Sequence, residues 1–129
     1  MRKAMHRLLT EDPTLASLLP ADKWFQRGSV PDKPVTPFAV EAWQGEEVRG
    51  KSLVVPRFTL WVYQSRGSYH IIDEVLRRAT ELLTSTVQYE YDGERLGQMD
   101  FEGSSVDLFD DVYRANTRNA GYRVIGSGL

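Results

Sequence analysis

The chain contains no cysteine in its 129 residues. Disulfide bonds, thiolate metal ligands and a cysteine nucleophile are therefore excluded. No apolar run approaches the ~18 residues of a membrane-spanning helix, so we expect neither a transmembrane segment nor a membrane partner. The formal net charge is only −2, which excludes the global positive field that draws a protein to nucleic acid.

Histidine is also scarce, and the two histidines, His6 and His70, lie in different predicted elements. Neither has a carboxylate at metal-ligand spacing, so we interpret both as surface or helix-end residues. The chain has no Gly-x-Ser-x-Gly nucleophile motif, and its glycine-bearing segments match neither a dinucleotide fingerprint nor a phosphate-binding loop. The histidines and these motifs therefore predict no catalytic residue, cofactor or metal site, which favours a binding or assembly role over an enzyme.

The chain does have the composition of an ordinary globular domain, with 41% hydrophobic and 26% charged residues. Residues 1–129 are enough for one domain that buries its own core. Residues 57–64 alternate as a β-strand does, and residues 69–83 repeat apolar side chains every three or four positions, as an amphipathic helix does. Trp61 and Tyr63 share one face of this strand. Because the other face is also bulky, the Trp61 face is covered either by this chain or by a partner subunit.

Polar residues of the long helix predict its local contacts. Ser68 is the expected N-cap. Asp73 with Arg77, and Glu74 with Arg78, are spaced as i,i+4 ion pairs worth ~0.3 kcal/mol each, so the apolar stripe is expected to stabilise the helix more than they do.

Short helices are predicted before residues 57–83, and further strands are predicted on both sides of this segment. One short helix is expected at residues 2–9 and another after Asp12-Pro13, where Asp caps and Pro starts a helix. Further strands are expected at residues 23–27, 38–43, 86–91, 96–101 and 121–125. This order predicts an α+β fold, in which an antiparallel or mixed sheet of about four to five strands carries the long amphipathic helix and the short N-terminal helices.

The densest acidic cluster lies at residues 100–111 and lacks the spacing of a calcium loop. Three interpretations remain open: a solvated or salt-bridging contact surface, a divalent-ion site, and the carboxylates of a small metal-dependent hydrolase or nuclease. The basic and aromatic residues at 113–123 either pair with these aspartates, within the chain or across an interface, or form a weak nucleic-acid surface. The connection at residues 44–55 is long for a hairpin, and loops of that length often carry function.

Several of these segments follow the pattern of one known family. They are the helix and Asp-Pro restart at residues 8–19, the Pro-aromatic strand start at 37–40, the strand–turn–helix at 60–76 and the acidic turn at 102–111. On these segments the chain resembles the tail terminator, or tail-completion, proteins of long-tailed bacteriophages, in particular those of actinobacterial phages. The shared features are apolar and turn residues, so the resemblance supplies no catalytic residue.

The resemblance implies a non-enzymatic structural protein of the virion. Such a protein forms a ring, usually a hexamer, that caps the tail tube at the head–tail junction, ends tube polymerisation and provides the surface for head attachment. The implied partners are further copies of the chain, the tail-tube protein and the head connector or neck protein. Assembly would occur in the host cytoplasm, and DNA would pass through the lumen without sequence-specific binding. A head–tail connector or stopper of the neck is the alternative within this class.

A head-to-tail ring needs two different, complementary surfaces on each subunit. The acidic stretch at residues 100–111 and the basic stretch at 114–123 are candidates for such a pair, and the 44–55 loop would reach the tube or line the lumen. The residues expected at the subunit or tube interface are Glu46, Glu47, Arg49, Lys51, Trp61, Tyr63, Asp107, Asp110, Asp111, Arg114 and Arg118.

Overall fold

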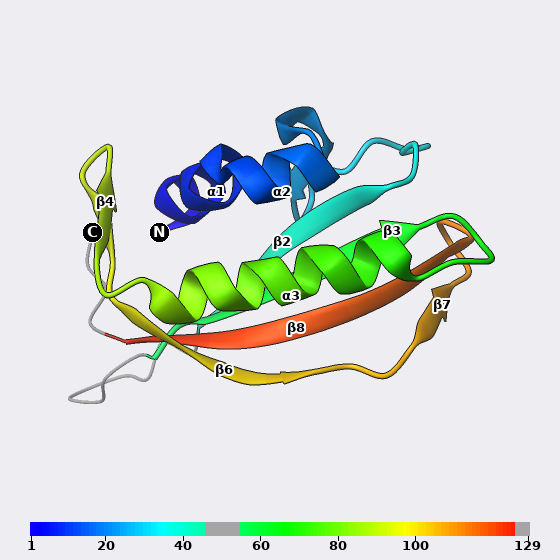
Figure 1. Cartoon of the computed structure of the whole chain (residues 1–129). Helices are drawn as coiled ribbons and strands as arrows, with labels where there is room; N and C mark the ends of the chain where they lie inside the picture. Colours follow the sequence, from blue (N-terminus) through cyan, green and yellow to red (C-terminus); the bar gives the residue numbers. More distant parts are fainter. Residues whose placement is uncertain (46–54, 126–129) are drawn as a thin grey trace.

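The computed structural model describes residues 1–45 and 55–125. Over these residues, helices α1, α2 and α3 lie on one side of a six-stranded mixed sheet, which gives two layers (Figure 1). The predicted α+β class, with one long helix on a mixed sheet, is therefore confirmed. None of the helices in the described part is both long and apolar enough to cross a membrane.

The main sheet is built around two long antiparallel neighbours in its centre. Its order is β1 (Trp24–Gln26), β2 (Phe38–Gln44), β3 (Arg57–Gln64), β8 (Ala115–Ile125) and β6 (Gln98–Ser104), with β7 (Leu108–Asp110) also paired to β8. β1 runs parallel to β2, whereas the remaining pairs are antiparallel. A separate hairpin is formed by β4 (Tyr89–Tyr91) and β5 (Glu94–Leu96).

The core lies between this sheet and the helices. The helices are α1 (Arg2–Glu11), α2 (Pro13–Leu18) and α3 (His70–Ser85), and a 3₁₀ turn, η1 (Ala21–Lys23), leads into β1. The apolar stripe of α3 is buried against the alternate residues Phe58, Leu60 and Val62 of β3, as their periodicities predict. Burial of these side chains supplies the main stabilisation of the layer, at roughly 1.5–3 kcal/mol for each large apolar residue.

The predicted polar contacts of α3 are wrong, because partners from elsewhere in the fold replace the local ones. The N-cap position is Tyr69, which makes no capping side-chain bond. Instead, Gln64 at the end of β3 accepts hydrogen bonds at Oε1 from the Ile71 and Ile72 amides, at 2.9 and 3.3 Å. Ser68 Oγ only accepts from the His70 amide at 3.3 Å.

The predicted i,i+4 ion pairs are replaced by other pairs, of which some lie within α3 and some reach distant elements. Arg77 pairs with Glu74 at 2.6 Å and with Glu81 at 3.1 Å. Arg78 reaches the buried Asp12 at 2.7 Å, and Asp73 pairs with Arg118 at 2.7 Å. Asp12 also caps α2 through the Leu15 amide, as the Asp-Pro signal predicts.

Strand boundaries differ from expectation mainly in the C-terminal third. The last strand is β8, which starts at Ala115 and not at 121, and its first residues pair with β7, a strand that was not predicted. The sheet therefore has six strands and not the expected four to five. The residues at 116–119 are polar, so the sequence shows no strand pattern in the first half of β8. Thr117 is nevertheless buried there and donates through Oγ1 to the Val62 carbonyl at 2.9 Å. The expected strand at 86–91 is reduced to β4, and the expected strand at 96–101 is divided between β5 and β6.

Candidate interaction surfaces

The two faces of the main sheet differ in what covers them. The face toward α1, α2 and α3 carries the large core, whereas no helix of the described residues covers the other face (Figure 1). Strand alternation assigns Phe38, Val40, Trp61 and Tyr63 to this second face, where they form a smaller apolar cluster. We call it the helix-free face.

An aromatic cluster fills one end of the helix-free face. Phe38 and Tyr63 stack at 4.6 Å between ring centroids, and Tyr113 meets their rings edge-on at 5.4 and 5.2 Å. Tyr63 is 6% exposed. Burial, with a further contribution from the charge of Asp110, raises the pKa of the Tyr63 phenol to about 12. Tyr63 is thus covered by its own chain.

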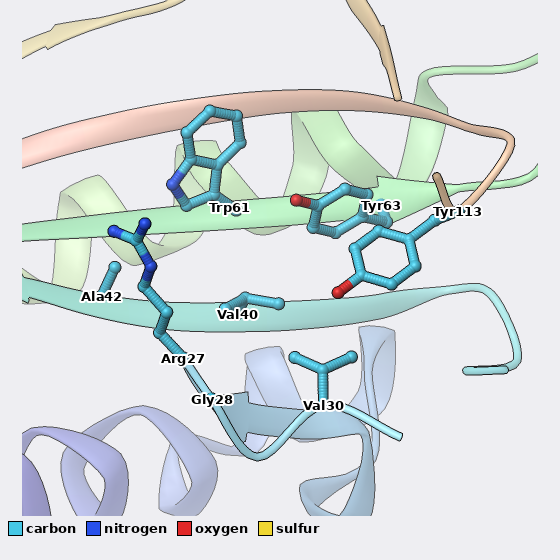
Figure 2. A pocket seen from close by; sticks show the side chains of 8 residues that line it. All are labelled: Arg27, Gly28, Val30, Val40, Ala42, Trp61, Tyr63 and Tyr113. Atoms are coloured by element: carbon cyan, nitrogen blue, oxygen red, sulfur yellow. The ribbon is translucent and has the colours of Figure 1, made fainter. Parts of the chain in front are cut away.

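Trp61 lies at the open part of the same face and is only half-buried. It borders a pocket of about 350 Å³. The pocket is lined by Arg27, Gly28, Val30, Val40, Ala42, Trp61, Tyr63 and Tyr113. Figure 2 shows the Arg27 side chain extending from the end of β1 across β2 toward Trp61. A concave surface with aromatic walls and one cation suits a protein segment that carries an apolar side chain and a carboxylate.

The acidic turn is held together by contacts within the chain. Asp110 Oδ1 accepts a hydrogen bond from the Tyr113 amide at 2.8 Å, which closes the turn between β7 and β8. Arg118 lies 3.6 Å from Asp107 in addition to its contact with Asp73. The predicted pairing of the C-terminal arginines with nearby aspartates within the chain is therefore confirmed at Arg118 and also at Arg123, which lies 3.4 Å from Asp100.

The other predicted charges are placed differently. Asp111 and Arg114 are exposed in the turn, where Arg114 adopts a left-handed φ of 53°. Glu46, Glu47, Arg49 and Lys51 lie outside the described residues. Across residues 1–45 and 55–125, no group of three or more His, Asp or Glu residues is arranged to hold a metal ion.

A partly buried ionisable cluster around Glu41 was not predicted from the sequence. His6 Nδ1 lies 2.6 Å from Glu41 Oε2, and Gln26 Nε2 donates to Glu41 Oε1 at 3.2 Å. His6, expected at the surface or at a helix end, instead lies half-buried within α1 and contacts a carboxylate. The available signal was Glu41 itself, because an acidic residue within an otherwise apolar strand needs a buried partner.

Comparisons with known proteins identify the fold. No family model matches the sequence, and no curated protein matches it. A solved chain from the "virion of native gene transfer agent (GTA) particle" is similar to this one, with a TM-score of 0.75 and 14% identity, over 99% of this chain and 95% of that chain. A second solved structure, whose name describes no function, has a TM-score of 0.64 and 12% identity, over 95% of this chain and 92% of the other. At these identities the likeness shows a shared fold.

Proposed function

We propose that this protein is a structural component of a phage-like virion and acts as its tail terminator. The observation that carries the proposal is the fold shared along 99% of the chain with a component of a virion particle. The sequence resemblance to tail terminator proteins selects the finer role. In that role the protein forms a ring at the head–tail junction, stops the growth of the tail tube and presents a surface for the head.

The chemistry of the surfaces supports an assembly role. A ring of identical subunits needs contacts that join two different patches of each copy. The chain offers a half-open aromatic pocket around Trp61 and an exposed turn that carries Asp111 and contributes Tyr113 to the wall of that pocket. In the proposed ring these surfaces make fitted contacts between subunits, and the role requires no reacting groups.

The proposed partners are further copies of the chain, forming a homo-oligomer that we expect to be a hexamer, together with the tail-tube protein and the head connector. DNA would pass through the lumen without base-specific contacts. The segment that contains Glu46, Glu47, Arg49 and Lys51 is proposed to reach the tube. Deletion of residues 46–51 should therefore reduce binding to purified tube protein, measured by co-sedimentation, whereas unchanged binding would remove this segment from the interface.

The decisive experiment mixes the purified protein with tail-tube protein under conditions in which the tube polymerises. The expected result in negative-stain images is tubes with one capped end and arrested growth. Ragged polymers that are unchanged by the protein would contradict the terminator role. Binding to purified head connector without any effect on tubes would instead indicate a connector or stopper of the neck.

A further inference from the structure

The helix-free face has an open region that a partner can approach closely. Strand register aligns Ala42 with Thr59, Thr59 with Gly121, and Gly121 with Gly103, so one row of small residues crosses four strands. At Gly103, an added Cβ would meet no heavy atom of the described residues within 4 Å. Trp61 stands beside this row and gives it a half-exposed aromatic wall.

Exposed apolar side chains continue this surface toward β7. Leu108 pairs in register with Thr117, which is opposite Tyr63, so Leu108 shares the helix-free face and is 37% exposed. Val106 and Val112, on either side of β7, are 76% and 86% exposed. So many exposed large apolar residues within one short segment are typical of a contact surface.

The charges at the two edges of this surface are opposite. Arg27 follows β1, which is at one edge of the sheet. Asp110 is the last residue of β7, at the other edge, and Asp111 comes directly after it. Among the described residues, no carboxylate lies within 4.0 Å of the Arg27 guanidinium, and no cationic group lies within that distance of Asp111. The chain therefore presents a cation on one side of the aromatic pocket, and an exposed carboxylate in the turn whose Tyr113 lines the pocket's other side.

We propose that the helix-free face binds a second copy of this chain. In this interface the turn after β7 of one copy, with Asp111 and Val112, seats against Arg27 and Trp61 of the other copy. The occupant is another copy because the chain itself carries a segment with the chemistry that the pocket requires. The contact joins two different segments of each copy, and such a heterologous contact closes into a ring where the rotation between neighbouring copies returns to its start. It deepens the proposed function by naming the surfaces of that ring.

Cysteine cross-linking tests this contact directly, because the natural chain has no cysteine background. Arg27→Cys and Asp111→Cys alter exposed positions, so both variants are expected to fold. When the two are mixed under mild oxidation, we expect a disulfide-linked heterodimer in several-fold excess over the dimer that either variant forms alone. Glu90→Cys, on the hairpin at the end of the molecule far from β7, is the matched control partner for Arg27→Cys (Figure 1).

Equal yields with Asp111→Cys and with Glu90→Cys would overturn the proposal. Charge exchange provides an independent check. Arg27→Asp or Asp111→Arg alone should weaken self-association, and a mixture of the two variants should restore it. If the mixture stays as weak as either variant, the contact between Arg27 and Asp111 of two copies is rejected, and an acidic segment of a different protein is the next occupant to test.

Failure of the proposed interface can be told apart from failure of the proposed terminator role, because cross-linking tests the first and tube capping tests the second. Tubes that are still capped by a protein whose cross-link is absent would leave the terminator role intact and reject this interface. A strong cross-link from a protein that leaves tubes ragged would support the interface and reject the terminator role.

Discussion

Glu41 is a carboxylate with no solvent exposure on the otherwise apolar strand β2. Burying such a charge costs several kcal/mol unless hydrogen bonds and an opposite charge compensate. His6 and Gln26 provide these contacts from α1 and β1. One polar cluster therefore connects three elements that are distant in sequence, and it fixes how the N-terminal helix sits on the sheet.

The same cluster makes stability depend on pH. The hydrogen bond to Glu41 raises the pKa of His6 above its ordinary value of 6.5. A group whose pKa is raised by folding stabilises the folded state below its unfolded pKa, and that contribution is lost as the pH rises through the folded-state pKa. We therefore expect the free energy of unfolding to fall as the pH rises from the ordinary histidine pKa through the raised pKa of His6. Urea unfolding across this range measures the fall.

Two histidine variants provide the controls for this measurement. His6→Gln removes the titrating group, so the fall should disappear, and the loss of a partner for buried Glu41 should cost about 1–3 kcal/mol at the lower pH. His70→Gln removes the other, exposed histidine and should leave the fall unchanged. If His6→Gln retained the full pH dependence, another group would be responsible.

At the scale of the elements, strand β3 and helix α3 are joined by a cap that comes from the strand. Gln64 accepts from two amides of the first turn of α3 and is only 8% exposed. Gln64→Leu leaves these amides without an acceptor and should reduce stability by about 1 kcal/mol. Hydrogen exchange should accelerate selectively at the Ile71 and Ile72 amides. Gln64→Glu keeps an acceptor at a helix N-terminus and should preserve slow exchange, so equal protection in both variants would argue against the cap.

The elements also differ in how far the sequence predicts them. The strand–helix unit of β3 and α3 is predicted almost to the residue, because its apolar periodicity is a local property. The first half of β8 is not predicted by the sequence. Thr117 can be buried there because its hydroxyl donates to a carbonyl of β3, and only the folded chain brings that carbonyl close. The residues of the candidate site also differ in whether the sequence alone predicts them. Trp61 is identified by its doubly bulky strand, whereas Arg27 acquires its position from a pairing between β1 and β2.

At the scale of the whole molecule, the helices cover one face of the sheet and leave the other face for contacts. The aromatic cluster of Phe38, Tyr63 and Tyr113 closes one end of the helix-free face from within the chain. The chain itself therefore covers only part of the face that carries Trp61. Tyr63 is covered internally, while Trp61 retains exposed surface beside a pocket. In the proposed interface, that division confines the area open to a second copy to the surroundings of Trp61.

A pair of charge reversals separates assembly from folding at this scale. Asp111→Lys and Glu90→Lys change the net charge equally, and both sites are exposed, so each should alter the free energy of unfolding by no more than about 0.5 kcal/mol. Only Asp111→Lys changes the turn after β7, which we place at the subunit contact. We expect it to abolish or strongly reduce arrest of tube growth in negative-stain length measurements, while Glu90→Lys retains it. Equal arrest by the two variants would show that Asp111 makes no contact needed for capping, and equal loss would indicate sensitivity to total charge instead of to this turn.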